Sequence, residues 1–163
     1  MSKKYRLGAI GALLDEYERA IIDLKTVILG IDDKALTVIV DPYTSDEDCR
    51  SIQTILSHVI YSGYGYAVNI HNLKGHGIER PGKIYHNTKT KYIEDLESLF
   101  NFTDNVFKEF EDSEIEQLDD SLKIKVAWGQ SYDIEQMTEH AIVHILRHRR
   151  QIEKILQSGV VAM

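Results

Sequence analysis

Apolar side chains recur at steps of three and four residues along the first 30 residues, and this spacing is typical of a helix with one buried face. The pattern predicts a helix from about Tyr5 to Leu29, and Gly30 follows it as a typical helix stop. Only two prolines occur among 163 residues, so long uninterrupted helices can form. These features favour an all-α fold, and the length favours one domain over residues 1–163.

Three further segments carry helix signals. The second helix is expected to begin at Ser45, whose hydroxyl would cap an acidic first turn, and to end near Ile70. The third spans roughly Thr88 to Glu111, and the fourth runs from Asp133, a good N-cap, to Gln157. Gly63 and Gly65 lie inside the second helix, where they allow either close approach of another backbone or room for a bound molecule.

The connections suggest how these four helices assemble. Residues 71–87 form a long, glycine-containing connection, which fits a crossover between two parallel helices of a four-helix bundle. Residues 35–40 read as a short extended run. Apolar residues at every second position from Leu122 to Trp128 predict another short extended segment, packed over the end of the bundle before the last helix.

Charge and hydropathy exclude several classes of protein. A formal net charge of −7 weighs against a general phosphate-binding surface, so no nucleic-acid partner is expected. Arg147, Arg149 and Arg150 form the one tight basic cluster, which reads most simply as a solvated helix end. No stretch is long and apolar enough to span a membrane, and no signal-peptide pattern follows the basic N-terminus, so a cytoplasmic location is expected.

The single cysteine, Cys49, excludes an intramolecular disulfide and a zinc site built on cysteines. Its neighbours in the sequence include Asp46, Glu47 and Asp48, whose negative charges oppose formation of a thiolate. Cys49 is therefore interpreted as a structural residue rather than a nucleophile.

Histidines carry the clearest chemical signal. His144 and His148 occupy positions on the inward stripe of the fourth helix where a core residue is expected, and side chains four residues apart can chelate one metal ion. His58, in the body of the second helix, is the natural third ligand. Three histidines would leave a coordination position open, as in catalytic metal sites. The alternative is a group of hydrogen-bonded core histidines without metal.

Two segments carry a family resemblance. The run from Glu139 to Ile152, EHAIVHILRHRRQI, resembles the last-helix signature of the DinB/YfiT-like family, in which histidines lie four apart and precede Arg, a small or basic residue and Gln. The segment Ile55–Val59 resembles the second-helix motif of that family, and Trp128-Gly129 also fits. The resemblance extends from about Tyr5 to Leu156.

The resemblance implies an up-down-down-up four-helix bundle with a divalent metal ion, often nickel or zinc, held by His58, His144 and His148. It gives His140 a non-ligand position. Arg150 departs from the family pattern, in which many members have glycine. Relatives include thiol-dependent S-transferases or isomerases and metal-dependent hydrolases, and homodimers are frequent among them. The substrate or thiol cofactor would then be a small molecule.

Two functional hypotheses follow. In the first, the protein is a metalloenzyme in which the metal activates water or a small-molecule thiol, while Tyr61, Tyr64, Gln151 or Glu139 assist by hydrogen bonding. Packing is the competing role for both tyrosines. In the second, the protein is a non-catalytic bundle, the metal or histidine cluster is structural, and the function is protein–protein contact. No general acid or base, and hence no catalytic side chain, is assigned.

Overall fold

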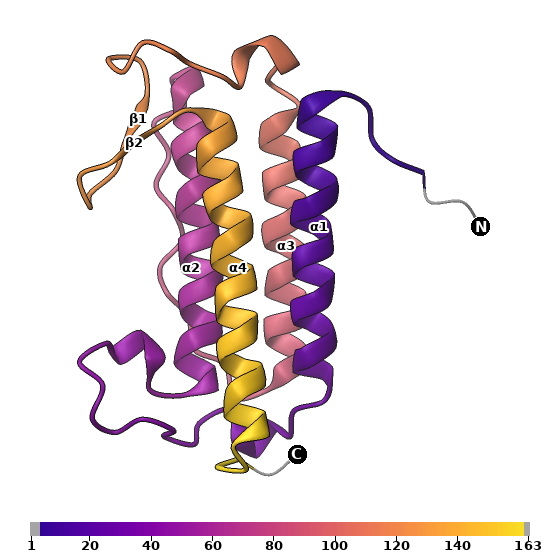
Figure 1. The fold of residues 1–163 in the computed structure, drawn as a ribbon, viewed down its shortest axis with the longest axis vertical. Coiled ribbons are helices and arrows are strands. Elements are labelled where there is room, and N and C mark those ends of the chain that lie inside the picture. The colour runs from indigo at the N-terminus through magenta and orange to yellow at the C-terminus, as the bar shows by residue number, and fades with distance from the viewer. Residues whose placement is uncertain (1–3, 162–163) are drawn as a thin grey trace.

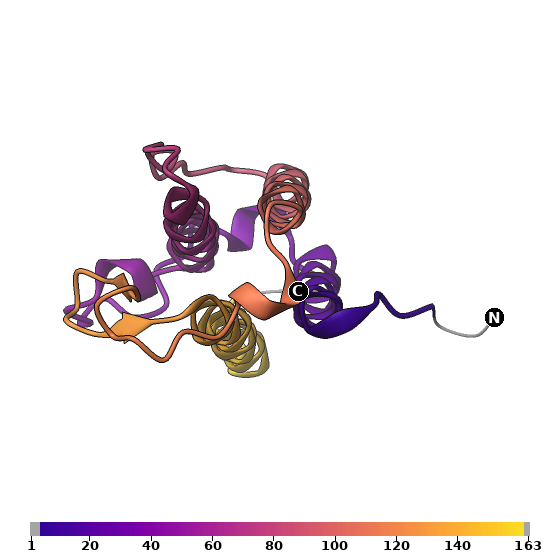
Figure 2. The same ribbon diagram turned by 90° about the horizontal axis from the view of Figure 1, so that it is seen from above.

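The computed structural model describes residues 4–161 and contains the four predicted helices (Figure 1). They are α1 (Gly8–Leu29), α2 (Ile52–His71), α3 (Lys89–Phe107) and α4 (Ile134–Gln157). Seen from above, the helices occupy the four corners of a bundle, with α1 and α2 each packed against both α3 and α4 (Figure 2). The predicted all-α four-helix bundle is confirmed.

The direction of the helices is up-down-down-up. α1 and α4 run the same way, α2 and α3 run the opposite way, and the connection between α2 and α3 returns along the length of the bundle (Figure 1). Hydrogen bonds fix both ends: Ile10 N donates to Asp112 Oδ1 over 2.9 Å, and Lys89 N donates to Asp33 Oδ1 over 2.7 Å. The connection between residues 71 and 87 is thus the crossover that its length predicted.

The start of α2 differs from the prediction. A separate 3-10 turn, Glu47–Cys49, precedes the helix and is capped by Asp46. The backbone is then extended at Ser51 (φ −148°, ψ 166°), whose side chain and that of Thr54 form a reciprocal capping box. The prediction that Ser45 caps this helix was therefore wrong, because the chain turns once more before Ser51 begins α2.

Two other helix boundaries differ from the predicted ones by fewer residues. α1 begins at Gly8 rather than Tyr5, because Leu7 has extended backbone geometry (φ −90°, ψ 150°). α3 ends at Phe107 rather than Glu111, because the amides of residues 108–110 donate to carbonyls three residues earlier instead of four. The fourth helix has the predicted N-cap, Asp133, and the predicted last residue, Gln157.

The predicted extended run at residues 35–40 is wrong. Asp33–Ala35 form a 3-10 turn, and the Leu36 amide donates to the Asp33 carbonyl. The turn buries Ala35 and Leu36 beneath the bundle end, whereas Val38 and Ile39 of the same run are exposed.

The extended segment before α4 is a small hairpin. β1 (Ile124–Lys125) pairs antiparallel with β2 (Ser131–Tyr132), and Ile124 lies opposite Tyr132. Gly129 adopts a left-handed conformation (φ +88°) in the turn between the strands. Ile124 and Val126 are buried against the core as the alternating pattern predicted, whereas Leu122 and Trp128 of the same pattern are exposed.

The two glycines of α2 serve close packing. A Cβ atom on Gly63 would lie 2.5 Å from Leu99 Cδ2 of α3, and one on Gly65 would lie 2.8 Å from Arg80 Nη1 of the crossover. Of the two roles considered for these glycines, close approach of neighbouring elements is seen at both, and Gly65 also lines a hollow of about 520 Å³ between α2, the crossover and the hairpin.

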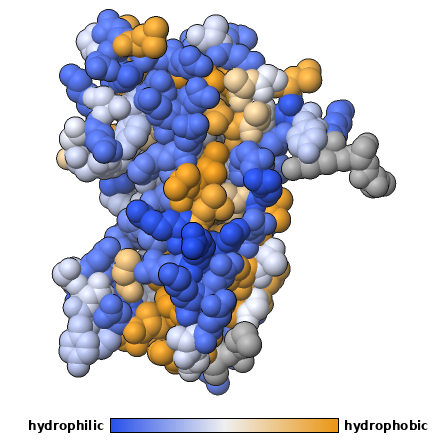
Figure 3. All heavy atoms as spheres, in the orientation of Figure 1, coloured by the Kyte–Doolittle hydropathy of each residue, from blue (hydrophilic) through white to orange (hydrophobic). Residues whose placement is uncertain are grey.

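The surface of the bundle is mostly hydrophilic on the face that carries α4, with several hydrophobic areas between the hydrophilic ones (Figure 3). Exposed apolar side chains on α1 and α4 are Ile22, Leu29 and Val143. In the part of the chain that the structure describes, each helix is too short or too polar to cross a bilayer.

Candidate metal centre

The geometry of α4 places two histidines in the interior. Asp133 starts the helix with a capping box, in which its carboxylate accepts from Gln136 N over 2.8 Å and the Gln136 side chain accepts from Asp133 N over 3.1 Å. The apolar stripe that follows packs against α1 and α2. His144 and His148 lie on this stripe and are only 6% and 4% exposed.

α2 contributes His58 to the same place. One ligand atom from each of His58, His144 and His148 can be chosen so that all three lie within 4.8 Å of one another. The Nε2 atoms of His58 and His144 are 3.0 Å apart, and the His148 ring centroid lies 4.5 Å from that of His144 and 5.1 Å from that of His58. The structure therefore brings together the three histidines that the sequence singled out.

Hydrogen-bond acceptors on the outer side of the cluster orient two of these rings. Asp48 Oδ2 lies 2.9 Å from His58 Nδ1, and Gln151 Oε1 lies 2.9 Å from His148 Nδ1. Because a carboxylate and an amide oxygen accept, each Nδ1 carries the proton and each Nε2 keeps its lone pair. This arrangement of an outer acceptor and an inward nitrogen is typical of histidine ligands to metals.

The inward Nε2 atoms of the three histidines have too few hydrogen-bond partners in the protein. His148 Nε2 is buried and has no hydrogen-bond partner among residues 4–161. The lone pair of His58 Nε2 faces His144 Nε2 at 3.0 Å, so a proton or a metal ion has to lie between them. Buried polar atoms are nearly always paired in native proteins, and this donor set fits a divalent metal ion.

The electrostatics keep the rings neutral. Burial, together with the positive charges of Arg147 and of His148 and His58 when protonated, lowers the pKa of His144 to about 2. Burial likewise lowers the pKa of His58 and of His148. Neutral imidazole is the form that binds metals, so burial favours the ligand state over the protonated one.

Asp48 stays ionised beside the cluster. Burial raises its pKa, but the hydrogen bond from Lys83 and the adjacent His58 outweigh that effect, and the net pKa is lowered. Lys83 belongs to the crossover, and it contacts Asp48 at the side chain. The crossover therefore supports the carboxylate that orients His58.

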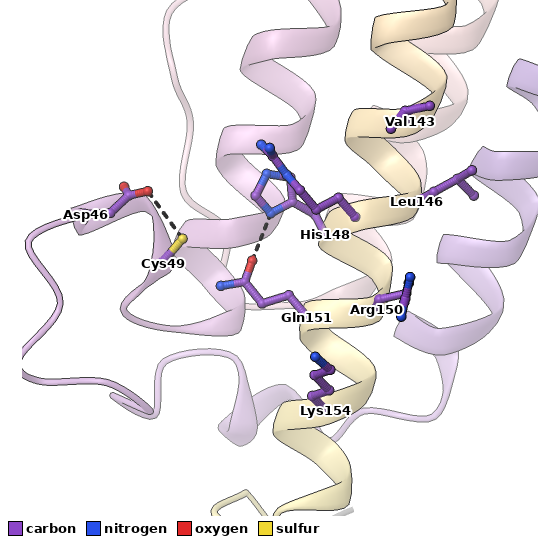
Figure 4. A pocket seen from close by; sticks show the side chains of 9 residues that line it. Asp46, Cys49, Val143, Leu146, His148, Arg150, Gln151 and Lys154 are labelled. Atoms are coloured by element: carbon purple, nitrogen blue, oxygen red, sulfur yellow. Dashed lines mark hydrogen bonds between the residues drawn. The ribbon is translucent and has the colours of Figure 1, made fainter.

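A surface hollow of about 890 Å³ opens beside His148. Figure 4 shows His148 and Gln151 on the side of α4 that faces the segment carrying Asp46 and Cys49. Three cationic side chains of α4 line the hollow as well: Arg147, Arg150 and Lys154.

The arginine cluster lies within α4 and not at its end. Arg149 pairs with Asp23 of α1 over 2.7 Å, and Arg147 and Arg150 flank the hollow. The interpretation of the cluster as a solvated helix end is therefore wrong, because the helix continues to Gln157.

Cys49 agrees with the structural role expected from its sequence. Burial raises the pKa of its thiol, and its Sγ donates to Asp46 Oδ2 over 3.4 Å. A thiol in this setting is a poor nucleophile near neutral pH.

The other residues considered as helpers have different roles. The Arg80 guanidinium lies over the Tyr61 ring, with its Cζ atom 3.6 Å from the ring centroid, and Tyr64 packs against Phe102. Glu139 is exposed and lines a separate hollow with His140. Packing, the competing role for the two tyrosines, is what the structure shows, and of the proposed helpers Gln151 is the one that contacts the cluster.

His140 lies next to the cluster but within an aromatic group. Its ring stacks on Trp128 at 5.9 Å between centroids and lies 5.5 Å from Tyr132 and 5.3 Å from Tyr66. Tyr66 in turn lies 5.7 Å from His144. This aromatic group covers the cluster on the side of the hairpin.

Sequence reasoning missed Asp48 and Tyr66. Tyr66 follows His58 by two steps of four residues, so helical periodicity could have placed it on the same face of α2. Asp48 carried no such signal, because its acidic turn was fully explained as the first turn of a helix.

The fold and the site define the class of protein: a four-helix bundle with an interior cluster of three histidines from α2 and α4. A family model described as the DinB family matches residues 1–160, and the chain belongs to that family. The search of curated proteins and the search of solved structures each found no significant match.

Proposed function

We propose that the protein is a metal-dependent enzyme in which His58, His144 and His148 hold one divalent ion, nickel or zinc. The observation that carries the proposal is the convergence of three neutral, mostly buried imidazoles, of which His148 Nε2 has no hydrogen-bond partner in the described chain. Membership of the DinB family supports the same reading.

The chemistry would be activation of a nucleophile. A divalent ion in a three-histidine site lowers the pKa of a bound water or thiol so that it can react near neutral pH. The residues of this chain orient the ligands through Asp48 and Gln151 and limit access of water by burial. Hydrolysis and transfer to a small-molecule thiol both fit this site.

The positive charges that line the hollow beside His148 favour a small anionic substrate or thiol cofactor. Arg147, Arg150 and Lys154 line it, while Asp46 supplies the one carboxylate. Guanidinium and ammonium groups recognise carboxylates and phosphates by charge-assisted hydrogen bonds. Because the pKa of Cys49 is raised, the reacting thiol in S-transfer would come from the small molecule.

The second candidate function is structural, and one observation favours it. The histidines come from two different helices, so a bound ion would tie α2 to α4. The protein would then act through contacts with another protein. The effect of chelation on stability separates this candidate from the enzyme.

The first test compares metal content in three proteins by inductively coupled plasma mass spectrometry. The His144→Ala variant is expected to hold one ion fewer per chain than the native protein and to lose any turnover found in hydrolysis and thiol-transfer screens. His140→Ala is the matched control, because it removes a neighbouring histidine outside the cluster. Equal metal content in the native and His144→Ala proteins would exclude the assignment.

The homodimer and the single domain over residues 1–163 remain predictions. Size-exclusion chromatography with light scattering measures the mass of the native particle directly, and a mass of one chain would reject the dimer.

A further inference from the structure

A second group of side chains with ligand atoms suited to a metal ion lies toward the other end of α2. His71 ends that helix, His76 lies on the crossover, and Glu109 follows α3. From the sequence, both histidines read as exposed polar side chains that need no explanation. In the structure, one ligand atom of each of the three residues can be chosen so that all lie within 4.8 Å of one another. His71 is separated from His58 by about 20 Å along the helix axis, at 1.5 Å per residue.

Of two separations within this group, one is close to that between two ligands of a zinc ion and the other is a hydrogen-bond distance. His76 Nε2 lies 2.7 Å from Glu109 Oε2, and His71 Nε2 lies 3.5 Å from Glu109 Oε1. Two ligand atoms bound to zinc at about 2.1 Å with tetrahedral geometry are about 3.4 Å apart. The three side chains therefore need only small adjustments to share one ion.

The surroundings of the His71 ring nitrogens favour a bound ligand. The His71 side chain is 17% exposed, yet both of its ring nitrogens are buried and neither makes a hydrogen bond within the described chain. Leaving a buried polar atom unpaired costs about 1–3 kcal/mol. The ring packs against His76, 3.8 Å between centroids, and against Phe102, so its position is fixed by neighbours.

An ordinary histidine–carboxylate ion pair explains only part of this arrangement. It accounts for His76 and Glu109 and places Glu109 Oε1 3.5 Å from His71 Nε2, but neither ring nitrogen of His71 makes a hydrogen bond within the described chain. The nearby Lys74 does not compete for Glu109, because its Nζ bonds Glu114 over 2.6 Å and lies over the Phe110 ring. The Glu109 carboxylate keeps its charge, since the hydrogen bond from His76 lowers its pKa.

We propose that His71, His76 and Glu109 form a second divalent-cation site, suited to zinc and separate from the three-histidine cluster. Two imidazoles and one carboxylate are a donor set that zinc accepts, with water completing the coordination at this partly exposed position. Because the ligands come from the end of α2, the crossover and the residues after α3, the ion would fasten the crossover to the bundle.

The test counts zinc ions on metal-free protein. Isothermal titration with zinc, followed by gel filtration and elemental analysis, is expected to give two ions per native chain. His76→Ala and Glu109→Gln should each give one. His144→Ala should also give one, and the double variant His76→Ala/His144→Ala should give none. Circular dichroism checks that every variant keeps the native helix content.

His86→Ala is the matched control, because His86 lies on the same crossover and pairs with Asp95 over 2.7 Å outside both clusters. This variant should keep two ions. The proposal is overturned if His76→Ala and Glu109→Gln bind as many ions as the native chain. If instead His76→Ala loses one ion and His144→Ala loses none, the second site stands and the three-histidine assignment fails.

Discussion

Single residues decide how the three imidazoles present themselves. Asp48 and Gln151 accept hydrogen bonds from the outer nitrogens of His58 and His148, so the inner nitrogens face one another with lone pairs available. Asp48 is itself held by Lys83 of the crossover. The negative charge next to His58 also makes that imidazole a stronger donor toward a cation.

Replacing Asp48 by asparagine tests this role. Asp48→Asn keeps the size of the side chain and removes its charge, and loss of such an outer partner typically weakens metal binding by about 10–100-fold. Competition with a chromogenic chelator measures the affinity. Glu47→Gln is the control, because Glu47 loses the same charge one residue away and its side chain is 80% exposed. Equal affinities for the two variants would contradict an orienting role of Asp48.

The residues that orient the histidines could be predicted from the sequence only in part. Gln151 was one of several predicted helpers with no assigned partner, and its contact with His148 is consistent with their i, i+3 spacing on one face of α4. Asp48 could not be found in the same way, because its contact with His58 depends on a 3-10 turn that folds back before α2. Contacts within one helix follow from spacing, whereas contacts between a turn and a helix require the tertiary structure.

The spacing between α2 and α3 is set in part by Gly63. Gly63 allows Leu99 of α3 to lie directly on the backbone of α2, where an added Cβ would come within 2.5 Å of a Leu99 methyl group. Leu99 is fully buried, so it has little freedom to move away. The close α2–α3 contact depends on this glycine.

Gly63→Ala is expected to destabilise the protein. Overpacking a core costs about 1–3 kcal/mol, and the better helix propensity of alanine returns about 1 kcal/mol, so a net loss of up to about 2 kcal/mol is expected. Denaturant unfolding followed by circular dichroism measures it. Gly82→Ala is the control, since its added Cβ would meet no atom within 4 Å and should leave stability unchanged or slightly higher. A Gly63→Ala protein more stable than the native one would rule out the tight contact.

Helix boundaries could be predicted where one signal acted alone. Asp133 and Gly159 bracket α4 without competition, and the helix has the predicted ends. Ser45 and Ser51 both offer a capping hydroxyl before the same apolar stripe. The later one caps the helix because Asp46 first closes a 3-10 turn, an alternative that local propensity does not rank.

The histidine cluster brings together residues from the first and the second half of the sequence. α2 and α4 are neighbours in the bundle, and His58 is 86 residues from His144 in the sequence. The core contains many fully buried apolar side chains from all four helices, so the bundle has packing interactions that do not involve the cluster. The topology agreed with the family resemblance, whereas helix periodicity alone did not determine the direction of each helix.

Removal of metal should therefore weaken the bundle without unfolding it. An ion present at about 100 times its dissociation constant stabilises by about 2.7 kcal/mol, which corresponds to about 5–11 °C in melting temperature for a domain of this size. Treatment with a chelator is expected to lower the melting temperature by that amount, with one cooperative transition and native helix content before it. Loss of the helical signal at room temperature would favour the structural role of the metal instead.

The separation between His58 and His144 also has a consequence for the order of events in the cell. Chains emerge from the ribosome N-terminal end first, at about 5–20 residues per second. When α2 emerges, its histidine has no imidazole partners, because α4 has still to be synthesised. A metal centre built on these three rings would therefore be complete only after translation has passed His148, and the face of α2 that packs against α4 stays uncovered by that helix until then.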